Sequence, residues 1–265
     1  MTLSHRLFYF PSENDTDKSS GYSINLWEPG DMNRKIGTLL ILAGTLLITA
    51  AQASSLEYRG VPNPVRVKLE DTLTFLKSMK AEQALPKNPA SPLHREVFGE
   101  FDGENYLRWF ETRIKRIGID SCGGGSATAC AIYFMPTWMY LTPYFVRSPL
   151  SRVAQLAVLL HEARHSEHDH NGWVHVECPI PFLDDQGQEI KSYFSGDKLA
   201  GLKACDDSEY GSYAAEYLFM SHVADYCSNC TATERNEART IADQGIYRIT
   251  DLRAREALRR DRADH

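Results

Sequence analysis

An almost uninterrupted apolar run extends from Val153 to Leu160 and ends at the polar stretch His161–His165. A helix that is apolar on every side is buried, whereas a surface helix carries only one apolar stripe. Ser151 stands just before the run, and serine is a favoured residue at a helix N-cap. We therefore expect a buried, rigidly held helix that begins after Ser151 and carries His161–His165 near its end.

Other stretches show shorter patterns of the same kind. Apolar residues recur at roughly helical spacing in two segments before the central run, and a third segment after it has the pattern of a buried helix. Two short apolar runs are typical of strands. In chain order these are Val65–Met79, Gly103–Ile117, Ala131–Met135, Met139–Thr142 and Ser212–Phe219. The sequence predicts an α+β fold, mostly helical, with a small sheet beside the central helix.

The first 53 residues have a different pattern. Residues 1–31 are polar and show no clear period, whereas residues 32–53 begin with basic residues, continue with a short apolar core and end at Ala51-Gln52-Ala53. That order is typical of a secretory signal peptide, and the core is short for a transmembrane helix. We expect translation to start at Met32, with residues 1–31 a non-native, disordered extension. The alternative is a cytoplasmic tail before a signal anchor.

Removal of the signal peptide after Ala53 would leave residues 54–265 as one exported domain, periplasmic or secreted, without a stable membrane span. The chain of 265 residues has 43% hydrophobic residues and a formal net charge of -6. This composition suits a globular protein, and the mild acidity gives no sign of nucleic-acid binding.

All six cysteines lie in the expected mature domain. An even number of cysteines in an exported protein indicates disulfides. Proximity along the chain favours Cys122–Cys130 and Cys227–Cys230, which leaves Cys178–Cys205. A redox role for Cys227 and Cys230, or a zinc knot of four cysteines, is a weaker interpretation.

The stretch His161-Glu162-Ala163-Arg164-His165 has the form H-E-x-x-H. Residues four apart share one face of a helix, so His161 and His165 can offer two imidazoles to one metal ion. Glu162 points in a neighbouring direction and can act as a base. This is the zinc metallopeptidase pattern. The competing interpretation is a surface helix rich in His and Glu, which the apolar residues before it disfavour.

A mononuclear zinc site needs a third protein ligand. The longer pattern H-E-x-x-H-x-x-G-x-x-H fails, because His168 and Asn171 stand at its Gly and last His positions. Gly172 could still turn the chain so that His175 reaches back to the metal. Asp207, at the entrance to the predicted helix Ser212–Phe219, and Glu216 within that helix are the acidic candidates.

The segment Asp207-Ser208-Glu209-Tyr210-Gly211 has the form D-x-x-Y-G. Together with H-E-x-x-H it resembles the deuterolysin and peptidyl-lysine metalloendopeptidases, the aspzincins, over roughly residues 130–250. Tyr140–Phe145 is similar to the segment before that family's metal helix. The resemblance implies a zincin-like fold with Asp207 as the third zinc ligand. Ala204 and Cys205 replace the family's Gly and Thr, and the insert that contains His175 departs from the family, so both ligands stay open.

These observations predict an exported zinc metalloendopeptidase that acts on protein or peptide substrates. Glu162 would be the general base, and Tyr210 or Tyr213 would stabilise the oxyanion. Asp206 would orient a ligand histidine or cap a helix. The alternative is an exported metal-binding or cell-envelope interaction protein that does not cleave peptides. A base beside two ligands favours catalysis.

Overall fold

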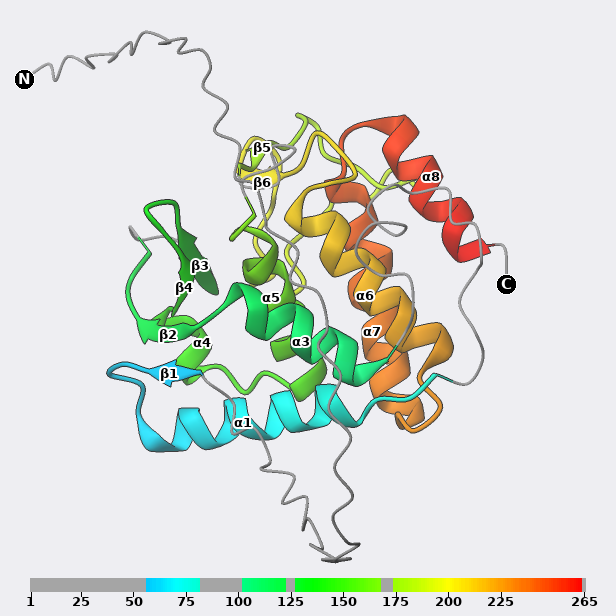
Figure 1. Ribbon diagram of the computed structural model, residues 1–265. Helices are drawn as coiled ribbons and strands as arrows, with labels where there is room; N and C mark the ends of the chain where they lie inside the picture. The colour runs from blue at the N-terminus through cyan, green and yellow to red at the C-terminus, as the bar shows by residue number, and fades with distance from the viewer. Residues whose placement is uncertain (1–55, 82–101, 123–126, 168–173, 264–265) are drawn as a thin grey trace, which may run out of the picture. The chain divides into compact units, whose positions relative to one another are not determined.

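The computed structural model describes residues 56–81, 102–122, 127–167 and 174–263 (Figure 1). All described residues belong to one compact unit. The expected upstream extension, 1–31, and the expected signal peptide, 32–53, lie outside the described residues.

Four strands form a small mixed sheet in the order β1-β2-β4-β3. Their bounds are Glu57–Tyr58 for β1, Arg116–Ile119 for β2, Ala129–Ile132 for β3 and Met135–Leu141 for β4. β1 and β4 run parallel to β2, and β3 pairs antiparallel with β4. β3 is therefore an edge strand, with one side of its backbone unpaired in the described sheet.

The strand predicted over Ala131–Met135 is two strands joined by a turn. β3 ends at Ile132, the chain turns at Tyr133 and Phe134, and β4 begins at Met135. The apolar run hides this turn because both aromatic side chains are exposed, Phe134 at 88%. Apolar content alone does not separate a buried strand from an exposed aromatic turn.

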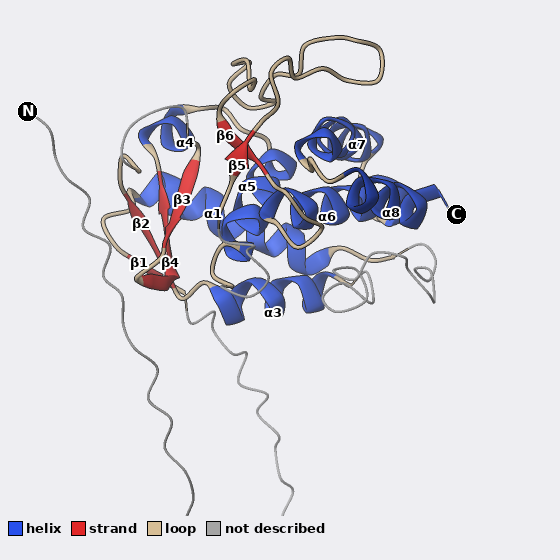
Figure 2. Ribbon diagram, turned by 90° about the horizontal axis from the view of Figure 1, so that it is seen from above, coloured by secondary structure: helices blue, strands red, loops and turns tan. Residues whose placement is uncertain are grey.

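Helices cover most of the remaining described chain. They are α1 (Asn63–Ser78), α3 (Gly103–Arg113), α4 (Pro143–Arg147), α5 (Arg152–Arg164), α6 (Ser212–Tyr226), α7 (Ala232–Gly245), the 3-10 turn η2 (Ile246–Arg248) and α8 (Leu252–Ala263). Figure 2 shows the four-stranded sheet on one side of α5, and α6 and α7 on the other. The architecture is compatible with the predicted α+β class.

The predicted central helix is α5. Every residue from Val153 to Arg164 is buried, since α5 contacts α1, α3, α6 and α7 as well as β3. Ser151 caps its start as expected, and the Ser151 hydroxyl accepts a hydrogen bond from the Ala154 N–H at 3.0 Å. The helix ends at Arg164, and His165 forms its C-cap. The motif therefore lies in the last turn of a helix that cannot move without disturbing the core.

A second, smaller ribbon pairs β5 (Val176–Glu177) with β6 (Lys203–Cys205) in antiparallel orientation. Its own hydrophobic cluster is separate from the main core and consists of Cys178, Phe182, Ile190, Leu199 and Cys205. We call residues 174–206 the ribbon region. It brings His175, just before β5, close to Asp206, just after β6.

The three predicted disulfides are confirmed. Cys122–Cys130, Cys178–Cys205 and Cys227–Cys230 are bonded, and no free cysteine remains. Cys122–Cys130 joins the edge strand β3 to the loop before it, and Cys178–Cys205 closes the ribbon region. Three disulfides fit an oxidising, exported location. Within the described residues, no helix has the length and apolar character needed to cross a membrane.

Candidate metal centre

His161 and His165 project from the end of α5 and are both buried, with 7% of each residue exposed. Their ring centroids lie 5.0 Å apart, and the rings meet edge to face. The i, i+4 spacing thus places the two imidazoles beside each other, as the motif requires.

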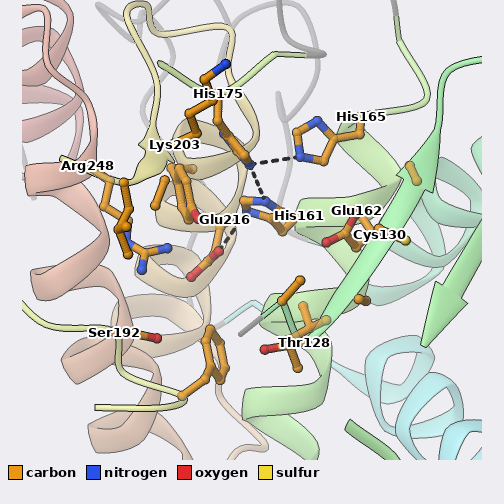
Figure 3. Close-up of a pocket in the computed structure, with 18 of the residues that line it drawn as sticks. Thr128, Cys130, His161, Glu162, His165, His175, Ser192, Lys203, Glu216 and Arg248 are labelled. Atoms are coloured by element: carbon orange, nitrogen blue, oxygen red, sulfur yellow. Dashed lines mark hydrogen bonds and ion pairs between the residues drawn. The ribbon is translucent and has the colours of Figure 1, made fainter. Parts of the chain in front are cut away.

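His175 completes a group of three. Its Nε2 atom lies 3.2 Å from Nε2 of His161 and 3.1 Å from Nε2 of His165. The ligand atoms of all three residues lie within 4.8 Å of one another. Figure 3 shows the three rings directed at one point.

These spacings suit a metal ion. Nitrogens at two tetrahedral positions, each ~2.05 Å from a zinc ion, are ~3.3 Å apart. The group could therefore hold a metal ion with little rearrangement.

Buried carboxylates hold the outer nitrogens of two of these rings. Nδ1 of His161 lies 3.0 Å from Oε2 of Glu216, and Nδ1 of His175 lies 2.8 Å from Oδ1 of Asp206. A carboxylate at Nδ1 favours the tautomer with the proton on that nitrogen and leaves the lone pair of Nε2 directed inward. The two acidic residues thus prepare the rings as metal ligands.

Asp206 serves two purposes at once. Its Oδ1 atom accepts from His175, while its Oδ2 atom accepts a hydrogen bond from the Tyr213 N–H at 2.7 Å. Both roles considered for this residue from the sequence, orienting a histidine and capping a helix, are thus present together. Gly211 makes this possible, because a Cβ atom there would overlap the Asp206 carboxylate.

The side chain of Glu162, a residue of α5, lies against the edge strand β3. The backbone N–H of Ala131 donates to its carboxylate, and burial raises its pKa to about 8. Its Oε2 atom is buried and has no hydrogen-bond partner among the described residues. A carboxylate oxygen in that state is costly to bury, which suits a group that exchanges a proton with a bound molecule.

Burial also shifts the other titratable groups here. It lowers the pKa of His161 well below its usual value, and so favours the neutral imidazole that a metal binds. It raises the pKa of Glu216 to about 7, an effect that the positive charge of Arg248 opposes.

The three histidines and Glu162 border one cavity of about 440 Å³. Residues 127–131, in β3 and just before it, line the cavity, as do Tyr213, Glu216 and Arg248. In Figure 3 Thr128 lies across the cavity from Glu216 and Arg248. The Tyr213 ring contacts two of the ligands, with its centroid 4.4 Å from that of His161 and 4.8 Å from that of His175. Burial raises the pKa of Tyr213, so its phenol stays protonated.

Two predicted site residues lie elsewhere. Asp207 is exposed and is not part of the three-histidine group, whereas its neighbour Asp206 supports His175. Tyr210 does not line the cavity, and its carbonyl oxygen accepts a hydrogen bond from Nε of Arg164 at 2.7 Å. Arg164 also makes an ion pair with Glu167.

Arg248, Ser192 and Phe194 also line the cavity, although no pattern in the sequence marks them. They come from turns without a recognisable motif. His168 and His170, which follow the motif in sequence, lie outside the described residues.

A scan against protein-family models and searches of curated proteins and of solved structures found no match to this chain. The chemistry of the site therefore has to be inferred from its own geometry.

Proposed function

We propose that this protein is an exported, zinc-dependent peptidase with a zincin-like catalytic domain. The observation that carries the proposal is the convergence of three imidazole Nε2 atoms on one point of a cavity that also contains the Glu162 carboxylate. A site that only stores metal has no need of a base beside its ligands.

His161, His165 and His175 would hold the zinc ion. Three histidines are a common ligand set for catalytic zinc and leave one coordination position open. This assignment differs from the aspzincin pattern, in which the position of Asp207 supplies a ligand. When bound, zinc polarises a carbonyl group and makes hydroxide accessible near neutral pH.

Glu162 would act as the general base. It would take the proton of the attacking water and then transfer it to the nitrogen of the leaving amine. Its position next to His161 in sequence and its place on the cavity wall support this role. Burial raises its pKa and so makes it a stronger proton acceptor than an exposed carboxylate.

The edge strand β3 offers a way to bind a peptide. An extended chain can add to a free sheet edge through main-chain hydrogen bonds. Ala129 and Ala131 line the cavity with small side chains, so a substrate could approach the β3 backbone closely. Tyr213, a protonated phenol on the opposite wall, is the candidate donor to the developing oxyanion in place of Tyr210.

Metal analysis and a casein digestion assay on residues 54–265 test the proposal. His161→Ala should lose zinc and activity together. Glu162→Gln should retain zinc and lose at least ~10²-fold in rate, because it removes a base but no ligand. Equal cleavage by Glu162→Gln and the wild type would contradict the peptidase proposal and favour the non-catalytic metal-binding alternative.

A further inference from the structure

The cavity continues beyond the metal centre along α5. Val158 lies three residues before His161, nearly one helical turn away, and it lines the same cavity with Phe194 and Leu199. We call the part bordered by Val158, Ser192, Phe194, Leu199 and Arg248 the side pocket. It has an apolar wall and one guanidinium group.

Hydrogen bonds hold the chain that forms this wall. The Tyr144 hydroxyl donates to the carbonyl oxygen of Phe194, and the Tyr193 hydroxyl donates to Oε1 of Glu237 at 3.0 Å. Segment 192–194 is thereby tied to α4 and α7. The side pocket is a built feature of the fold.

Arg248 is held at a fixed place relative to the metal ligands. Its carbonyl oxygen accepts a hydrogen bond from the Asp206 N–H at 2.8 Å. Its Cζ atom lies 4.2 Å from the centroid of the Tyr213 ring, and that ring stacks on His175. One aromatic ring therefore separates the guanidinium from a metal ligand.

The nitrogen atoms of the Arg248 guanidinium are available as hydrogen-bond donors. Among the described residues, no hydrogen bond or ion pair involves its nitrogen atoms, although Arg248 is half-buried. The two nearby carboxylates make hydrogen bonds to other groups, since Oε2 of Glu216 pairs with His161 and Asp206 bridges His175 and Tyr213. In Figure 3 Arg248 lies on the same side of the cavity as Glu216 and opposite Thr128.

A planar guanidinium binds a carboxylate through two parallel hydrogen bonds. Arg248 lies over the Tyr213 ring and lines the cavity. Lys203, which is exposed and also lines the cavity, adds a second positive charge. The side pocket thus matches a short chain with an apolar stem and a carboxylate at its end.

We propose that Arg248 determines specificity by binding a substrate carboxylate in the side pocket, and that the protein cleaves peptides next to an acidic group. This inference rests on the proposed peptidase function. The carboxylate is supplied by a Glu or Asp side chain or by the C-terminus of the substrate.

Digestion of a peptide library, followed by mass spectrometry, tests the substrate class. Matched peptides that differ only in Glu versus Gln at one position, each with a free or an amidated C-terminus, distinguish the two sources. We expect Glu peptides, or free C-termini, to be cleaved with kcat/KM about 10- to 100-fold above their neutral counterparts.

Arg248→Gln should remove this preference, and Arg248→Lys should restore part of it because the charge remains. Arg253→Gln is the matched control, since Arg253 is exposed on α8 and away from the cavity. An equal loss of rate for Glu and Gln peptides in Arg248→Gln would overturn the proposal and indicate that Arg248 only supports Tyr213.

Binding separates this proposal from the peptidase function. Calorimetry with the zinc-loaded Glu162→Gln variant measures the affinity for the Glu and Gln peptides without cleavage. Preferential binding of the Glu peptide that depends on Arg248, together with a wild type that cleaves none of the peptides, would support the carboxylate site and reject the peptidase. Cleavage by the wild type without any acidic preference would support the peptidase and reject the carboxylate site.

Discussion

Two regions of the molecule supply the three histidines, and they hold them in different ways. α5 carries His161 and His165 inside the main core, where every residue from Val153 to Arg164 is buried. The ribbon region carries His175 on a short two-stranded ladder with a cluster of five buried residues. Packing in the main core therefore fixes His161 and His165, whereas one disulfide and one carboxylate fix His175. This difference implies that metal affinity should be most sensitive to damage in the ribbon region.

The largest effect should come from the ligand of the ribbon region itself. His175→Ala should lower zinc affinity by more than ~100-fold, as much as His161→Ala, because each removes one of three ligands. Asp207→Ala is the matched test of the alternative ligand and should bind zinc like the wild type. Competition with a zinc chelator measures both. A loss of zinc in Asp207→Ala with retention in His175→Ala would reverse the assignment.

Core substitutions should separate the two regions by stability. Leu156→Ala in α5 should lower the free energy of unfolding by about 2–5 kcal/mol, because it leaves a cavity in the main core. Phe182→Ala in the ribbon region should weaken zinc binding and change the unfolding of the main core less, since the ribbon can open locally.

Thermal unfolding of the metal-free proteins, followed by zinc titration of each, gives the two quantities separately. The comparison fails if Phe182→Ala unfolds the whole domain while zinc binding by the folded fraction is unchanged.

The Cys178–Cys205 bond should matter more for the metal than the other disulfides. It spans 27 residues and closes the ribbon between His175 and Asp206. Replacing both cysteines with alanine should cost about 3–4 kcal/mol of stability and lower zinc affinity by roughly 10-fold. The Cys227–Cys230 pair, between α6 and α7, is the control and should leave zinc affinity unchanged. Equal effects of the two changes on zinc would show that the ribbon is not specially dependent on its disulfide.

The smallest effect should come from the carboxylate that supports His175. Asp206→Asn keeps the shape but weakens the charge-assisted bond to Nδ1, and we expect zinc affinity to fall about 10-fold. Asp207→Asn makes the same chemical change one residue away on the exposed surface and should have no effect. Metal titration of both variants is the measurement, and equal affinities would remove Asp206 from the metal centre.

Local patterns in the sequence determined much of the part of the site that lies on α5. The apolar run up to Leu160 predicted a buried helix, Ser151 its cap, and the spacing of His161 and His165 their shared face. These follow from short-range geometry, because helix period and capping depend on residues within a few positions of each other. The disulfide pairing was also predicted, because each of the three bonds joins two cysteines that follow one another in the sequence.

Tertiary structure decided which residues outside α5 enter the site. Whether His175 or Asp207 reaches the two helix histidines depends on the path of the ribbon region, and neither residue carries a local signal for that path. Tyr213 lines the cavity and Tyr210 does not. The Asp206 carboxylate accepts a hydrogen bond from the Tyr213 N–H at the start of α6 and packs against Gly211. Arg248 belongs to a turn after α7 and enters the site only through its contacts with Asp206 and Tyr213. Such contacts join residues far apart in the chain, and only packing of the whole domain brings them together.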